Sequence, residues 1–343
     1  MNLIEATKEE IDDLIKRLGY PSFRSKQVYS WAIKGVPVAE MSNLPKSLRD
    51  ALITEKTDVY LPTIQEKLIS VIDGTVKFLF ALADGQLIES VVMHYEHGNT
   101  ICVSCQAGCR MGCRFCASTL RGLSRNLTAG EILGQVIVAQ NELGVRISNV
   151  VMMGIGEPLD NYDNVLKFLR LVNNPDGLNI GYRHISLSTC GVVDGIYRLA
   201  EEDLPITLSI SLHCIDTEKR KELMPITNKW SVEELLLACK HYFRKTGRRI
   251  SFEYTLISRE NDSTDEADRL ADGLKNHLPG MPIHVNLIPL NPVKERGFSK
   301  SNTAAVAAFQ KRLTERGINA TVRRKLGPDI NASCGQLRLN AHN

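Results

Sequence analysis

The chain has 343 residues, which is long enough to bury one large core and a smaller appended domain. Its hydrophobic fraction of 43% and charged fraction of 24% are ordinary for a soluble globular protein. No apolar run approaches the roughly 20 residues that a membrane helix needs, and the N-terminus lacks an apolar signal core, so we expect a cytoplasmic protein. The net charge of +3 permits nucleic-acid binding without requiring it. Nine cysteines in such a chain favour metal or redox chemistry over a disulfide framework.

Residues 1–60 predict a small helical domain. Thr7 and Glu10 match a capping box at the start of the first helix, a second helix is expected over 25–33, and a third follows Pro45. The basic residues of these helices form either a solvated face, which composition favours, or a surface that contacts RNA. They are Arg24, Lys26, Lys34, Lys46 and Arg49.

Residues 61–97 predict a β-hairpin extension. Asp73 and Gly74 separate the runs 67–72 and 76–81, which is a strong hairpin pattern. The run 88–95 adds a third strand.

Residues 98–343 alternate between strands and helices. Six strand–helix units predict a parallel sheet, and because a closed barrel needs eight we expect an α/β fold with an open, partial (β/α)6 barrel. Chemistry in such sheets collects at the carboxyl ends of the strands. The expected strands cover 101–105, 149–153, 184–189, 206–213, 249–257, 283–290 and 318–324, and the expected helices begin at Thr128 or lie near 162–173, 192–202, 231–246, 263–277 and 302–316.

Three cysteines, Cys109, Cys113 and Cys116, lie in the long segment 106–127 after the first barrel strand. The spacing Cys-x3-Cys-x2-Cys in a glycine-containing loop can turn three thiolates toward one point, as an iron–sulfur cluster requires. Structural zinc sites and electron-transfer clusters normally have a fourth protein ligand. Three ligands therefore predict a cluster with one iron open to a substrate.

These cysteines, with Phe115 between them, resemble the signature of the radical S-adenosylmethionine superfamily. Within it, the sequence from the first helix to about Leu337 is similar to the dual-specificity ribosomal RNA and transfer RNA adenine carbon-2 methyltransferase family. The motifs that carry this resemblance include Cys102-Val-Ser, Gln106-Ala-Gly-Cys, Phe115-Cys-Ala-Ser-Thr, Arg125-Asn-Leu, Met153-Gly-Ile-Gly-Glu-Pro, Ser211-Leu-His, His284-Val-Asn-Leu and Ala332-Ser-Cys-Gly-Gln-Leu.

The resemblance implies that Cys109, Cys113 and Cys116 bind a [4Fe–4S] cluster whose open iron chelates S-adenosylmethionine. It also implies contacts with that cofactor at four successive strand ends. Each polar residue there has a plainer interpretation as a loop cap or turn, but their shared location favours one ligand. The implied contacts are Gly156, Glu157, Ser188, Ser211, Leu212, His213 and Asn291.

Cys334 is the second predicted centre. A lone cysteine is more often a small buried hydrophobic residue than a nucleophile. The resemblance implies instead that Cys334 takes a methyl group from one S-adenosylmethionine and becomes S-methylcysteine. The nearby Arg323, Arg324 and Lys325 would favour the thiolate if they point inward.

A radical route is implied because carbon 2 of adenine is electron-poor and not nucleophilic. A 5′-deoxyadenosyl radical from a second S-adenosylmethionine would remove hydrogen from methylated Cys334, and the resulting methylene radical would add to the ring. Glu89 matches the family's proton acceptor. Cys102 matches the resolving thiol, which releases the product through a transient disulfide with Cys334.

The chain departs from the family pattern at Cys105, Cys190 and Asn331. Cys105 competes with Cys102 for the resolving role, but alternation along a strand would place the two on opposite faces, which favours Cys102. Asn331 stands where aspartate is commoner, which leaves the charge beside Cys334 open. Two more cysteines are interpreted as packing residues, Cys214 and Cys239.

Two other functions compete with the carbon-2 reading. Carbon-8 adenosine methyltransferases share all five functional cysteines, although segment 117–123 looks more like the carbon-2 enzymes. An iron–sulfur or zinc protein that binds RNA without catalysis would have no need of the Cys102 and Cys334 pair. The expected partners are 23S ribosomal RNA, transfer RNA and a flavodoxin-type electron donor, with no membrane and a monomeric chain.

Overall fold

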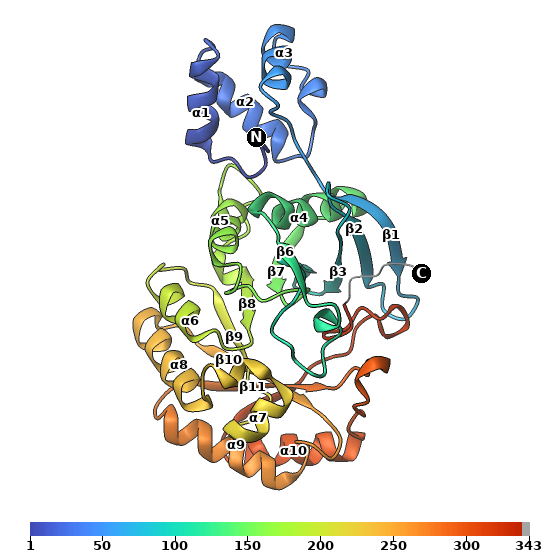
Figure 1. Cartoon of the computed structure of the whole chain (residues 1–343), viewed down its shortest axis with the longest axis vertical. Coiled ribbons are helices and arrows are strands. Elements are labelled where there is room, and N and C mark those ends of the chain that lie inside the picture. Colours follow the sequence, from blue (N-terminus) through green and yellow to red (C-terminus); the bar gives the residue numbers. More distant parts are fainter. Residues whose placement is uncertain (338–343) are drawn as a thin grey trace.

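The computed structural model describes residues 1–337, and its N-terminal helices form a lobe of their own (Figure 1). These helices are α1 (Lys8–Arg17), α2 (Phe23–Ala32) and α3 (Lys46–Thr54). The predicted capping box is present, because the Thr7 side chain accepts the Glu10 N–H and the Glu10 carboxylate accepts the Thr7 N–H. The helical prediction for this region is confirmed.

The rest of the chain is built on one ten-stranded sheet, in the order β1-β2-β3-β4-β7-β8-β9-β10-β11-β12. Strands β1 to β4 pair antiparallel, and β4 to β12 pair parallel. No ladder in the described residues joins β1 to β12, so the barrel is open as predicted. The strands are β1 (Thr63–Ile69), β2 (Val76–Ala81), β3 (Leu87–Tyr95), β4 (Gly98–Cys102), β7 (Ile147–Met152), β8 (Ile185–Thr189), β9 (Thr207–Ser211), β10 (Ile250–Leu256), β11 (Ile283–Pro289) and β12 (Asn319–Val322).

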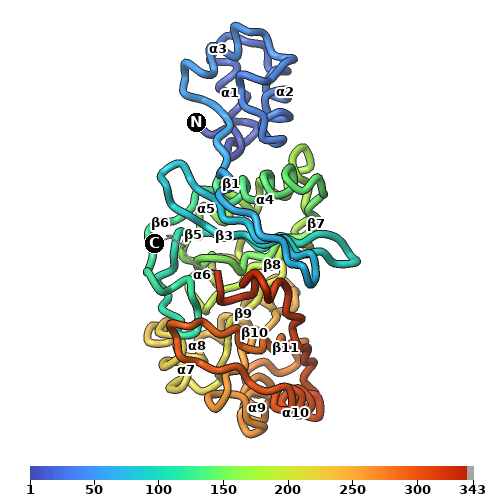
Figure 2. Tube along the Cα trace, turned by 90° about the vertical axis from the view of Figure 1, so that its right-hand side faces the viewer, coloured from blue at the N-terminus to red at the C-terminus, as the bar shows by residue number. Residues whose placement is uncertain are grey.

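Helices cover the outer face of the parallel strands, and the chain is elongated with the N-terminal lobe at one end (Figures 1 and 2). None of the helices in residues 1–337 combines the length and the hydropathy that a membrane crossing would require. The helices are α4 (Ala129–Leu143), α5 (Tyr162–Asn173), α6 (Val193–Ala200), α7 (Thr217–Leu223), α8 (Val232–Thr246), α9 (Thr264–His277) and α10 (Thr303–Glu315).

Three details of the sequence prediction are wrong. The first barrel strand is β4, which ends at Cys102 and not at Cys105, because the N–H of Cys105 donates to Ile155 O in the loop after β7. Strand β1 ends at Ile69, and a loop over 70–75 replaces the tight Asp73-Gly74 turn. The segment 106–127 contains a small second sheet of β5 (Gln106–Gly108) and β6 (Leu123–Asn126).

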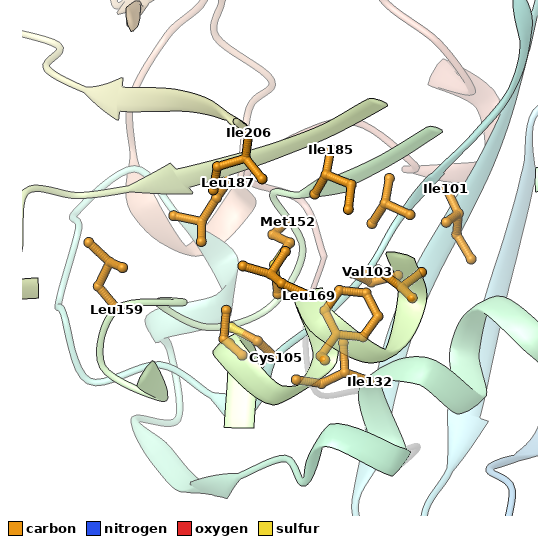
Figure 3. Packing of buried hydrophobic residues seen from close by; sticks show 14 of the residues in the cluster. Ile101, Val103, Cys105, Ile132, Met152, Leu159, Leu169, Ile185, Leu187 and Ile206 are labelled. Atoms are coloured by element: carbon orange, nitrogen blue, oxygen red, sulfur yellow. The ribbon is translucent and has the colours of Figure 1, made fainter. Parts of the chain in front are cut away.

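The two faces of the main sheet differ in character. Apolar side chains such as Ile101, Met152 and Leu187 pack toward the helices and form the core (Figure 3). On the opposite face, Ser188, Ser209 and Ser251 lie in register across β8, β9 and β10. A row of polar side chains inside a barrel does not contribute to a hydrophobic core, so it indicates a surface that binds a ligand.

Candidate active site

A cavity lies at the carboxyl ends of the parallel strands, on their polar face. The cysteine loop, the ends of several parallel strands with the loops that follow them, and the C-terminal segment form its wall. Many of the residues that the sequence singled out lie there. Those residues are Cys109, Cys113, Cys116, Gly156, Glu157, Ser188, Ser211, His213, Asn291 and Cys334.

The cysteine loop is held by hydrogen bonds to its own carbonyl groups. The Thr119 hydroxyl donates to Cys113 O and to Cys116 O, both at 3.1 Å. Cys109 N–H donates to Gly122 O at 2.9 Å, and the Arg296 guanidinium donates to Cys116 O at 3.1 Å. These hydrogen bonds fix the backbone of the loop, so the loop does not depend on its three sulfur atoms for its conformation.

Burial raises the pKa of Cys109 to about 12 and raises the pKa of Cys113 and of Cys116 as well. Within residues 1–337, no three His, Cys, Asp or Glu side chains are close enough to hold one metal ion. A four-iron cluster, which takes one thiolate on each of three irons and replaces the costly protons, fits this donor set.

Glu157 is buried in the wall, and burial raises the pKa of its carboxyl. Its two oxygens accept the N–H groups of Leu159, at 3.0 Å, and Cys190, at 2.8 Å. Gly156 precedes it with φ +108°, and a Cβ there would lie 2.6 Å from Cβ of Gln106. Only glycine fits this position, so the loop after β7 brings its backbone to the cavity edge.

His213 is a neutral donor in the wall. Its Nδ1 accepts the Thr255 N–H at 2.9 Å, so the ring proton is on Nε2. Burial lowers the pKa of His213 to about 3, and Phe115 packs edge-on against its ring. Leu212 differs from the other predicted contacts, because its side chain is in the core and its N–H donates to Glu253 O.

Cys334 lies on the carrier segment, which we define as residues 327–337. The Asn291 amide donates to Cys334 O at 3.2 Å, and Ala117 N–H, in the cysteine loop, donates to Gly335 O at 2.8 Å. Farther along, the Ser118 hydroxyl donates to Leu337 O at 2.8 Å. The carrier segment is thus bonded directly to the loop that bears the three cysteines.

The β1–β2 loop holds the other end of the carrier segment. The Asp73 carboxylate accepts Gly327 N–H at 2.9 Å, and Asp329 accepts the Ser70 hydroxyl at 2.7 Å and Val71 N–H at 3.0 Å. One contact joins a carboxylate of the loop to the carrier segment, and the other joins a carboxylate of the carrier segment to the loop. We call these contacts the latch.

Cys102 and Glu89 do not line this cavity. Cys102 packs in a small buried cluster with Ala332 of the carrier segment, and burial followed by the charge of Cys334 raises its pKa to about 12. Glu89 lies on the same face of the sheet, since Val91 of β3 pairs with Cys102 of β4. The buried Glu89 carboxylate is 3.1 Å from Lys77 Nζ. Cys102 and Glu89 therefore lie on the face of the sheet against which the carrier segment packs.

The other unassigned cysteines have separate environments. Cys105 is buried among the core residues (Figure 3) and does not line the cavity, but β4 ends before it, so the alternation argument of the sequence analysis does not apply. Cys190 lines the cavity and positions Glu157 through its N–H. Cys214 and Cys239 are both buried, and Cys239 packs in the main core as predicted.

Arg323 and Glu253 form a buried network that the sequence analysis did not assign as a site. Asn286 donates to the Glu253 carboxylate at 2.7 Å, and Arg323 lies 3.9 Å from it. Among the three basic residues near Cys334, Arg323 points inward, and the charge of Cys334 is the largest cause of its raised pKa. A polar residue at every second position of β10 was the available signal for Glu253.

The fold and the site define the class of protein. A model of the radical SAM superfamily matches residues 103–271, and a model described as the ribosomal RNA large subunit methyltransferase N-terminal domain matches residues 1–57. A solved radical SAM methyltransferase from Sphaerobacter thermophilus superposes with a TM-score of 0.92 at 41% identity, covering 99% of this chain and 100% of that one. The chain is a radical SAM enzyme, and its superfamily implies a [4Fe–4S] cluster and S-adenosylmethionine.

Curated relatives narrow the class to a family. A probable dual-specificity RNA methyltransferase RlmN from Clostridium botulinum (strain Eklund 17B / Type B) is 55% identical over 338 residues, which cover 98% of this chain and 96% of the relative. A relative with the same description from Clostridium novyi is 51% identical over 341 residues, with 99% and 98% covered. The chain belongs to the RlmN family of dual-specificity RNA methyltransferases. The reading as an RNA-binding protein without catalysis is thereby wrong.

Proposed function

We propose that this enzyme methylates carbon 2 of a specific adenosine in 23S ribosomal RNA and in transfer RNA, with Cys334 as methyl carrier. The observation that carries the proposal is the position of Cys334. It lies in the wall of the cavity that holds the three-cysteine loop, while its segment packs on Cys102. A carrier needs access to a methyl source and to a resolving thiol, and this position offers both.

Cys109, Cys113 and Cys116 hold the cluster in this proposal, and Gly156, Glu157, Ser188, Ser211, His213 and Asn291 surround the cofactor. The Glu157 carboxylate keeps lone pairs free after two backbone bonds, which suits an ammonium group. The His213 Nε2–H is a donor that stays neutral at physiological pH. When bound, the cluster and S-adenosylmethionine supply the methyl group and the radical that removes hydrogen from methylated Cys334.

The chain's own residues complete the reaction. Glu89, held beside Lys77 as an ion pair, accepts the ring proton of the adenosine attached to Cys334. Cys102 then bonds to the Cys334 sulfur as the carbon–sulfur bond to the RNA breaks, and a disulfide is left. The Cys102 proton goes to the freed methylene carbon, which becomes the methyl group, and the unpaired electron of the adduct would return to the cluster. At neutral pH Cys102 is a thiol, since its pKa is about 12, so it reacts only when its proton is removed.

Several finer assignments belong to the same proposal. The three-part division at residues 1–60, 61–97 and 98–343 assigns the N-terminal helices to RNA contact. Within that lobe, Arg24 and Arg49 donate to backbone carbonyls, which leaves Lys26 and Lys46 as the better candidates for phosphate. We also propose a flavodoxin-type donor, a monomeric chain and a cytoplasmic location.

The decisive experiment treats unmodified 23S ribosomal RNA and transfer RNA with anaerobically reconstituted enzyme and analyses the nucleosides by liquid chromatography and mass spectrometry. We expect 2-methyladenosine, separated from an 8-methyladenosine standard. Methylation at carbon 8 would replace the proposed position with the competing one. Unmodified RNA with both substrates would overturn the proposal.

A further inference from the structure

A second cavity lies beside the first and shares Ile288, Asn291, Arg323 and Cys334 with it. Cys334 therefore lies between two chambers. The first chamber contains the cysteine loop and the proposed cofactor residues. The rest of the second chamber is lined by residues to which the reaction scheme above assigns no role.

Besides the shared Arg323, three cations line the second chamber, namely Lys300, Arg324 and Lys325. All three are exposed, and no acidic group in residues 1–337 forms an ion pair with any of them. The net charge of the chain is only +3, so three unpaired cations around one cavity are a local concentration of positive charge. Unpaired cations that line one cavity can bind the phosphate groups of a nucleic acid.

An aromatic side chain completes the chamber. Tyr95, at the end of β3, is partly buried in its wall and stacks on the ring of His97, with ring centroids 5.1 Å apart and planes 17° apart. Its hydroxyl contacts Met93 Sδ, which also lines the chamber. Proteins bind single-stranded nucleotides by stacking bases on aromatic rings and placing cations along the backbone.

We propose that the second chamber receives the adenosine turned out of the RNA, with Tyr95 against the base and Lys300, Arg324 and Lys325 on the neighbouring phosphates. This inference rests on the proposed function. An enzyme that modifies a base atom must take that base out of its stack. Access to Cys334 from two sides separates loading of the methyl group, in the first chamber, from its delivery to the base, in the second.

The main test removes the three cations together, in a Lys300→Ala, Arg324→Ala, Lys325→Ala variant. A matched control carries Lys240→Ala, Arg244→Ala and Lys275→Ala, which removes three unpaired cations from the outer helices α8 and α9. RNA affinity is measured by fluorescence anisotropy with a labelled transcript across a salt series. Methylation of Cys334 is measured without RNA, by intact-protein mass spectrometry.

We expect the chamber variant to bind RNA about 10- to 100-fold more weakly, with a salt slope shallower by about 2 to 3, because three phosphate contacts are lost. Methylation of Cys334 should proceed at the wild-type rate, and the control variant should match the wild type in both assays. Wild-type RNA affinity and salt slope in the chamber variant would overturn the proposal. So would a loss of Cys334 methylation, since the cations would then serve the first chamber.

Tyr95 is tested separately. Tyr95→Leu keeps an apolar side chain but removes the stacking ring, and we expect kcat/KM for RNA to fall by about 10- to 100-fold. Tyr95→Phe keeps the ring and should retain most of it. Equal activity of Leu and Phe variants would exclude stacking. Failure of the wild type to methylate any RNA would instead defeat the proposed function itself.

Discussion

The cysteine loop and the carrier segment hold their sulfurs in opposite ways. The loop is anchored in the fold by the β5–β6 sheet, by the Thr119 bonds and by Arg296. The carrier segment has no strand or α-helix, and side chains of other segments hold it at Gly327, Asp329 and Cys334. A cluster must stay in place for every turnover, whereas a carrier must exchange partners. The same cavity wall therefore contains cysteines on an anchored loop and a cysteine on a segment without regular secondary structure.

The largest expected effect separates the two regions directly. Cys113→Ala should lose the cluster and all activity, because two thiolates cannot hold it. Cys334→Ala should also lose RNA methylation, yet it should keep full iron and sulfide content and still cleave S-adenosylmethionine under reduction. Iron and sulfide counting, with assay of 5′-deoxyadenosine, measures both. Loss of iron in the Cys334 variant would show that the carrier segment belongs to the cluster site.

A second prediction tests the partner of the carrier. Cys102→Ala removes the resolving thiol, so the RNA should remain covalently attached to Cys334 and turnover should stop after one event. Denaturing gel electrophoresis with labelled RNA detects the adduct. The Cys105→Ala variant is the matched control, since Cys105 is buried in the core and does not line the cavity. An adduct that accumulates only in the Cys105 variant would reverse the two assignments.

A third prediction concerns the fixed wall. The pKa of His213 is lowered to about 3 from 6.5, so the unfolded chain binds a proton between these values and the folded chain does not. His213 therefore penalises folding as pH falls below 6.5, by about 2 kcal/mol at pH 5.

The matched variant is His213→Asn, whose amide oxygen can accept the Thr255 N–H and whose side chain tolerates the positive φ of 57°. Urea unfolding at pH 5 and pH 7 should show a smaller loss of stability on acidification in the variant than in the wild type. Identical pH dependence in the two proteins would mean that His213 is protonated in the folded chain.

The smallest expected effect tests the latch. Asp73→Ala leaves Gly327 N–H without its acceptor, which costs about 1 kcal/mol locally. Amide hydrogen exchange in residues 327–334 should accelerate several-fold, while exchange in the cysteine loop stays unchanged. The control is Glu66→Ala, which removes an exposed carboxylate from β1. Equal acceleration in both segments would mean that they open together, against the comparison drawn above.

The fold could be predicted from the sequence because its information is local. The capping box at Thr7, the strand–helix alternation and the count of parallel strands all depend on nearby residues. The cysteine spacing likewise identified the loop of the first chamber. The end of β4 was misplaced, since an N–H to Ile155 O decides it and that partner is distant in sequence.

The parts of the site that the sequence did not reveal depend on contacts between distant segments. Arg323, just after β12, lies 3.9 Å from Glu253 of β10. Leu212 was included among the cofactor contacts because it belongs to the matched motif Ser211-Leu-His, but its side chain packs in the core. The Asp73 contact with Gly327 joins residues that are far apart in the chain. The spacing and periodicity of residues in the sequence do not indicate such long-range contacts.

The latch also has a consequence for the open barrel. The β1–β2 loop belongs to one edge of the ten-stranded sheet, and the carrier segment follows β12 at the other edge. The latch therefore links the two edges of the sheet by side-chain hydrogen bonds, where no backbone ladder of the described residues joins them. The segment that bears Cys334 is therefore tied to both edges of the open barrel, to β12 through the backbone and to the β1 edge through the latch.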